Sequence, residues 1–136
     1  MKPPVAADLT WTGELRFSGT SGTTGITLDG NGVAGPSPVL ALVYALAGCM
    51  AADVVYILTK ARHPLRALAA HVTGERAQQD PHRLIKVDLR FDIGGTVPKD
   101  AADRAIALSR EKYCSVWHSL NPDIDFHVTC DIHADA

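Results

Sequence analysis

The residue types best suited to covalent chemistry in this 136-residue chain are three cysteines, Cys49, Cys114 and Cys130. None of them belongs to a Cys-x-x-Cys pair, and three widely spaced cysteines do not make the disulfide framework of a small secreted protein. In a reducing compartment each cysteine is therefore either a small buried side chain or a working thiol. A working thiol needs a cation or a helix N-terminus nearby, because only the thiolate is reactive.

Two of the cysteines are followed by a polar residue at a spacing of four. Asp53 follows Cys49 and His118 follows Cys114, which places each pair on one face of a helix. Three functions remain open on this pattern: thiol redox chemistry, a zinc site of two thiolates, one imidazole and one carboxylate, or a dimer whose cysteines only pack. Because a carboxylate in an apolar helix needs a partner, we expect Asp53 to pair with Lys112 or with an arginine.

The third cysteine lies in a segment whose apolar residues alternate with polar ones. Cys130 is in register with Ile124, Phe126, Val128 and Ile132. This period of two predicts a final strand with Cys130 on its buried face. We therefore expect a structural role for Cys130 and no part in redox chemistry.

The elements before the first cysteine change in character at Ser37. Upstream, LTWTGELRFSG and TGITLDGNG are rich in Thr and aromatic residues and are cut by glycines, which favours two or three antiparallel strands. The turn at residues 29–32 closes this section. Ser37 and Pro38 then suit the N-cap and first position of a helix.

That helix is apolar on nearly every side. From Val39 to Leu58 the only charged residue is Asp53, and the uncharged run from Val39 to Ala52 is shorter than the roughly 20 residues that cross a membrane. An all-round apolar helix must be buried, but a domain of this size covers only one of its faces. We therefore expect an obligate homodimer in which the central helices pack together, and no membrane association.

The remaining chain predicts two strands, a helix and a last strand. Residues 67–77 and 85–93 alternate between apolar and polar and are joined by a polar turn at 78–82. Beyond Gly94-Gly95, Asp100 is the expected N-cap of a second helix, with an interruption near 109–113 and a stop at Asn121-Pro122. The predicted order is β-β-β-α-β-β-α-β, an α+β fold in a single domain over residues 1–136.

Composition narrows the function classes. The chain is 46% hydrophobic and 21% charged, with a formal net charge of -2, which fits one soluble domain. Without a basic excess, nucleic acid is not an expected partner. The first ten residues contain no apolar signal segment, so we expect a cytoplasmic protein.

Three stretches together resemble the OsmC/Ohr family of thiol peroxidases, in particular its small YhfA-like branch. They are GPSPVLALVYALAGCMAADVVYIL (35–58), GERAQQDPHRLIKVDLRF (74–91) and ALSREKYCSV (107–116). The resemblance implies an intertwined homodimer with outer sheets and central cysteine helices. It matches Cys49 to the peroxidatic cysteine and Cys114 to the resolving cysteine, and it matches Cys130 to neither.

The chemistry implied by this resemblance is reduction of a hydroperoxide, without a metal or organic cofactor. Cys49 would become a sulfenic acid and condense with Cys114 to a disulfide, and an external dithiol would reduce that disulfide. The apolar helix favours organic hydroperoxides as substrates. The family's peroxidases also use an arginine, for which Arg16 is the candidate. Their glutamate after the helix-opening proline is missing, because Val39 and Leu40 stand there.

Overall fold

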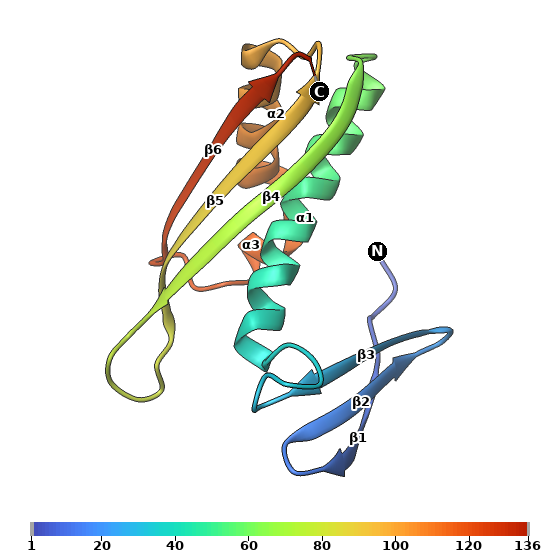
Figure 1. Ribbon diagram of the computed structural model, residues 1–136, viewed down its shortest axis with the longest axis vertical. Coiled ribbons are helices and arrows are strands. Elements are labelled where there is room, and N and C mark those ends of the chain that lie inside the picture. Colours follow the sequence, from blue (N-terminus) through green and yellow to red (C-terminus); the bar gives the residue numbers. More distant parts are fainter. Residues whose placement is uncertain (1, 136) are drawn as a thin grey trace. The chain divides into compact units, whose positions relative to one another are not determined.

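The computed structural model describes residues 2–135 and begins with a three-stranded antiparallel sheet (Figure 1). Its strands are β1 (Asp8–Gly13), β2 (Arg16–Ser21) and β3 (Thr24–Asp29), paired in chain order. Gly22, with φ of 59°, makes the tight turn between β2 and β3, a conformation that glycine adopts without steric cost. The strands predicted from the sequence are confirmed.

The long helix α1 spans Pro38–Lys60. The Ser37 hydroxyl accepts the Leu40 N–H at 3.2 Å, so Ser37 caps the helix as predicted. One stripe of α1 is buried in the chain itself; it consists of Val43, Leu46, Ala47, Met50, Val54 and Leu58. By length and composition α1 would also span a membrane, a test that core helices of globular proteins pass as well.

The second sheet supplies the surface that α1 covers. It consists of β4 (Leu65–Arg76), β5 (Leu84–Gly95) and β6 (Asp125–His133), in that order. β4 and β5 pair antiparallel, whereas β5 and β6 pair parallel. Along β5, Leu89 and Phe91 are buried while Asp88 and Arg90 are exposed, which confirms a strand with one wet face.

The parallel pair requires a crossover connection, and this connection carries Cys114. It consists of α2 (Lys99–Leu108), a π-helical turn η1 (Ser109–Tyr113) and the short helix α3 (Ser115–His118). The predicted interruption is therefore confirmed, and the predicted cap is wrong. Pro98 occupies the N-cap position of α2, and Asp100 lies inside the first turn, where its charge still favours the helix dipole.

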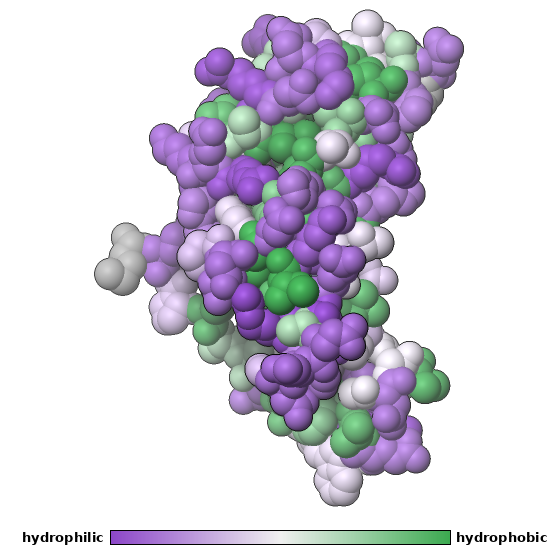
Figure 2. All heavy atoms as spheres, turned by 90° about the vertical axis from the view of Figure 1, so that its left-hand side faces the viewer, coloured by the Kyte–Doolittle hydropathy of each residue, from purple (hydrophilic) through white to green (hydrophobic). Residues whose placement is uncertain are grey.

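The contacts divide the chain into two compact units, residues up to Leu42 and residues from Val43 onward. In the second unit, α1 and the crossover lie on the same side of the sheet (Figure 1). The side of β6 is covered mostly by hydrophilic side chains, with smaller hydrophobic patches between them (Figure 2). The element order predicted from the sequence is confirmed, and a single domain over 1–136 stays a prediction.

Candidate functional site: the Cys49 and Cys114 thiols

Cys49 lies in the middle of α1, beside its buried stripe. Its neighbour Met50 is fully buried and its neighbour Gly48 is exposed, whereas Cys49 itself is half-buried. The helix therefore holds the Cys49 thiol at the boundary between the core and the surface of the second unit. A small reagent can reach such a thiol without unfolding of the helix.

Cys114 lies between the π-helical turn and α3, not within a helix as the sequence suggested. Its φ of -73° and ψ of 99° are extended, because the wide turn ends there. The Cys114 N–H donates to the Ser109 carbonyl oxygen at 2.8 Å. The Cys114 sulfur accepts the Trp117 N–H at 3.4 Å and so caps α3. The side chain is fully buried.

The two thiols are brought together although they are 65 positions apart in the sequence. Burial raises the pKa of the Cys114 thiol from 9.0 to about 11, although the Trp117 N–H opposes the rise. This value also includes the effects of the neighbouring Cys49 side chain and of the Asp53 carboxylate, which act in the same direction as burial. At neutral pH Cys114 is therefore a protonated thiol that neighbours Cys49.

Asp53, one turn after Cys49, has a different partner from the one predicted. The Ser109 hydroxyl donates to the Asp53 Oδ2 at 2.8 Å, and no ion pair of Asp53 is found among residues 2–135. Within the chain, the expected pairing with Lys112 or an arginine is therefore not found, and the Ser109 hydroxyl satisfies the half-buried carboxylate instead.

Ser109 is the residue that sequence reasoning missed. It is fully buried and stands on the same face of the crossover as Ala102, Ala105 and Ile106. A serine at an otherwise apolar i, i+3, i+4, i+7 position was the available signal, because a buried hydroxyl needs a hydrogen-bond partner.

The zinc alternative does not fit this geometry. His118 is exposed, and its Nε2 lies 3.0 Å from the Arg110 carbonyl oxygen. Within the described part of the chain, no three His, Cys, Asp or Glu side chains are arranged to hold a metal ion. The pairs at a spacing of four therefore do not combine into a tetrahedral site.

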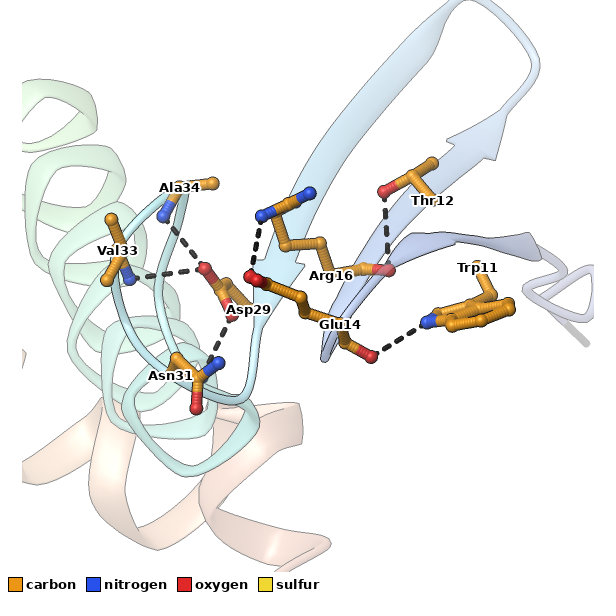
Figure 3. A network of polar contacts seen from close by, with 8 residues as sticks. All are labelled: Trp11, Thr12, Glu14, Arg16, Asp29, Asn31, Val33 and Ala34. Atoms are coloured by element: carbon orange, nitrogen blue, oxygen red, sulfur yellow. Dashed lines mark hydrogen bonds and ion pairs between the residues drawn. The ribbon is translucent and has the colours of Figure 1, made fainter.

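Arg16 opens β2 and is held by its own unit (Figure 3). Its Nη1 donates to the Glu14 Oε2 at 2.9 Å, and the Arg16 side chain is 39% exposed. Arg16 belongs to the first unit and Cys49 to the second. The participation of Arg16 in the cysteine chemistry therefore stays a prediction.

Asp29, at the end of β3, organises the turn that precedes α1 (Figure 3). Its carboxylate accepts the N–H groups of Asn31 and Ala34 at 2.9 Å each and of Val33 at 3.3 Å. The Ala34 and Asn31 bonds lower the pKa of Asp29, and the charge of Arg16 contributes in the same direction. Arg16 thus has an ion pair with Glu14 and a favourable charge interaction with Asp29.

Cys130 is buried, as predicted, but it has polar neighbours. The Lys99 Nζ lies 3.4 Å from the Cys130 sulfur, and the thiol donates to the Asp103 Oδ1 at 3.4 Å. Burial raises the pKa of Cys130. The thiol therefore connects β6 to the first turns of α2.

Known proteins resemble this chain in both sequence and structure. The family described as OsmC-like protein matches residues 29–129. Protein YhfA of Escherichia coli (strain K12) is 41% identical over 115 residues, which cover 82% of this chain and 86% of YhfA.

Solved structures share the fold. A hypothetical protein from Aquifex aeolicus VF5 superposes with a TM-score of 0.91 at 23% identity, over 99% of this chain and 100% of that one. An organic hydroperoxide resistance protein from Elizabethkingia anophelis superposes with a TM-score of 0.72 at 16% identity, over 98% and 99% of the two chains. The chain belongs to the OsmC-like family.

Proposed function

We propose that this protein is a thiol-dependent reductase of organic hydroperoxides, with Cys49 as the peroxidatic cysteine and Cys114 as the resolving cysteine. The observation that carries the proposal is the proximity of these two thiols across 65 positions of sequence. A two-cysteine mechanism needs such proximity, because a disulfide forms only between Cα atoms within roughly 7 Å. Relatives of the same fold named as organic hydroperoxide resistance proteins support the substrate class.

The order of the two cysteines follows from their surroundings. Cys114 is fully buried and keeps its proton, with a pKa of about 11. Cys49 is half-buried and is the thiol that a hydroperoxide reaches. A protonated, shielded thiol is a poor first nucleophile, so Cys49 reacts first.

The proposed cycle has three balanced steps. The Cys49 thiolate attacks one peroxide oxygen, the O–O bond breaks, and the alkoxide leaves and takes up a proton to become the alcohol. The Cys49 sulfenic acid then condenses with the Cys114 thiol, which releases water and forms the disulfide. An external dithiol reduces this disulfide by exchange and leaves as its own disulfide. Neither a metal nor an organic cofactor takes part.

Arg16 is the proposed cation for the thiolate and the peroxide. Glu14 holds the Arg16 guanidinium at 2.9 Å, so it replaces the glutamate that is missing at Val39 and Leu40. A guanidinium fixed by a carboxylate is pre-organised, which lowers the entropy lost when it binds a developing negative charge.

A homodimer is part of the same proposal. Beside its buried stripe, α1 leaves an apolar face exposed, which includes Tyr44 at 62%, Val55 at 38% and Tyr56 at 63%. Ala45, Gly48 and Ala52 lie between them and are exposed as well. A second copy packed on this face removes the apolar surface from water. It also encloses the Cys49 region in the apolar surroundings that suit an organic peroxide.

A coupled assay tests the proposed function. Wild-type protein should consume cumene hydroperoxide with dihydrolipoamide as reductant, and Cys49→Ser should abolish this consumption. In Cys114→Ser, one equivalent of peroxide should leave a sulfenic acid on Cys49, detected by mass spectrometry. Cys130→Ala is the matched control and should retain turnover. Oxidation of Cys114 before Cys49, or turnover in Cys49→Ser, overturns the assignment.

A further inference from the structure

Ser109 connects the elements that carry the two reacting cysteines. Its hydroxyl donates to the Asp53 Oδ2 on α1 at 2.8 Å, and its carbonyl oxygen accepts the Cys114 N–H at 2.8 Å. Asp53 lies one turn beyond Cys49 on the same helix face. A single residue thus joins the backbone of Cys114 to the helix face of Cys49.

Within the segment between Ser109 and Cys114, only Arg110 has anchoring contacts, with its guanidinium over the Trp117 and Phe126 rings and its carbonyl oxygen near the His118 ring. Glu111, Lys112 and Tyr113 are exposed, and the π-helical turn is a rare, locally irregular conformation that is frequent at functional sites. Its two ends are buried at Ser109 and Cys114. On the side that faces α1, the hydrogen bond of Ser109 with Asp53 is the contact that ties this segment to the helix of Cys49.

We propose that the Asp53–Ser109 hydrogen bond is a positioning clamp that holds Cys114 against Cys49 for disulfide closure. This inference rests on the proposed roles of the two cysteines. In the closure step the S–S bond forms and the S–O bond of the Cys49 sulfenic acid breaks. The hydroxyl leaves with the Cys114 proton as water. Asp53 and Ser109 are positioning residues in this step and exchange no atoms with the cysteines.

The effect expected of the clamp is on effective concentration. Two groups that are held at reacting distance react faster because little freedom of motion remains to be lost. A misplacement of about 1 Å can lower the reaction rate about 100-fold. Loss of the clamp should therefore slow closure and weaken the disulfide relative to an external dithiol. Both quantities are measured in folded protein.

Two substitutions separate geometry from charge. Ser109→Ala removes the donor and leaves the carboxylate, whereas Asp53→Asn removes the charge and keeps an oxygen that accepts the Ser109 hydroxyl. Ser119→Ala is the control, because the Ser119 hydroxyl donates to the Ser115 carbonyl oxygen at 2.7 Å within the same crossover and does not reach α1. Asp53→Ala removes the acceptor from the other side and serves if Ser109→Ala does not fold.

The experiment drives closure with diamide, which oxidises dithiols without a peroxide. The disulfide is then equilibrated with dithiothreitol, and circular dichroism verifies the fold of each variant. Ser109→Ala, or Asp53→Ala in its place, should slow closure and lower the equilibrium constant for the disulfide by at least about tenfold. Asp53→Asn should stay within about threefold of wild type, as should Ser119→Ala.

The outcomes distinguish this inference from the proposed function. If the wild-type protein forms the disulfide with diamide but does not react with peroxide, the peroxidase function is excluded and the clamp is still supported. Ser109→Ala that closes and equilibrates like wild type would overturn the clamp. So would Asp53→Asn with a loss equal to that of Ser109→Ala, because charge and not position would then be responsible. Wild type that forms no Cys49–Cys114 disulfide under either oxidant overturns both.

Discussion

The Arg16 guanidinium donates to the Glu14 carboxylate at 2.9 Å across the turn between β1 and β2. Glu14 holds this position with a φ of 48°, a left-handed conformation that is uncommon outside glycine. The Trp11 indole N–H donates to the Glu14 carbonyl oxygen at 2.8 Å and fixes the turn from its other side (Figure 3). The turn therefore orients a cation without help from α1.

The first prediction concerns this pair. Arg16→Ala should lower the rate of Cys49 oxidation by cumene hydroperoxide by about 10-fold or more, because removal of one fixed charge from such a site typically costs that much. Glu14→Gln should cost less, since the guanidinium remains and loses only its ionic partner. Stopped-flow rates of sulfenic acid formation in the Cys114→Ser background measure both. Equal rates for Arg16→Ala and its parent would exclude Arg16 from the site.

The second prediction follows from the raised pKa of Cys114. The unfolded thiol ionises near 9.0, whereas the folded thiol keeps its proton up to about 11. Between these pH values the unfolded chain binds fewer protons than the folded one. The contribution of the Cys114 thiol to the free energy of unfolding is therefore full below pH 9 and is lost as the pH rises toward 11. A rise of two pKa units corresponds to a loss of about 2–3 kcal/mol.

Urea unfolding at a series of pH values measures this loss. The free energy of unfolding of wild type minus that of Cys114→Ala should fall by about 2 kcal/mol between pH 8.5 and 10.5. The subtraction cancels the titration of Cys130, whose pKa is also raised. A difference that is independent of pH would show that the folded Cys114 thiol ionises normally.

The third prediction concerns Cys130. Cys130→Ala removes a buried sulfur and its contacts with Lys99 and Asp103, and it should lower the free energy of unfolding by roughly 1–2 kcal/mol. The ion pair of Lys99 with Asp103, at 2.7 Å, remains and limits the loss. Peroxide-driven disulfide formation should stay at the wild-type rate. Loss of this oxidation in folded Cys130→Ala would mean that the wrong thiols had been assigned.

The fourth prediction tests the homodimer through Gly48. A Cβ added at Gly48 would have no atom within 4 Å other than those of its chain neighbours and of the adjacent helix backbone, and replacement of a helical glycine favours the helix. Gly48→Arg should therefore leave the protomer folded and disrupt only a contact made by the exposed face of α1. Sedimentation should show about twice 14.5 kDa for wild type and a single 14.5 kDa protomer for the variant.

Arg104→Glu is the control, because Arg104 is exposed on α2, away from this face. It should sediment as wild type does. A wild-type protein that stays monomeric at micromolar concentration contradicts the dimer, and a Gly48→Arg protein that remains dimeric places the interface elsewhere.

Local pattern determined most of the secondary structure. The alternation along β5 and β6 and the Ser37–Pro38 start of α1 depend on side-chain periodicity and capping, which act within a few residues. The interruption of the crossover at Ser109–Tyr113 was also visible in the sequence, whereas its cap at Pro98 was not. The position of an N-cap depends on the backbone angles of one residue. The sequence around the start of α2 was compatible with a cap at either Pro98 or Asp100.

The candidate site was likewise predicted in part from the sequence and decided in part by the tertiary structure. The sequence by itself predicted Cys49 and Cys114 as the reacting cysteines through a resemblance that covers most of the chain, and it placed Cys130 in the core through strand register. Only the tertiary structure decided that Asp53 pairs with Ser109, which lies 56 positions away in the sequence. The physical reason is that a polar side chain takes whichever partner the packing of distant elements brings within about 3 Å. Sequence spacing does not encode that distance between α1 and the π-helical turn.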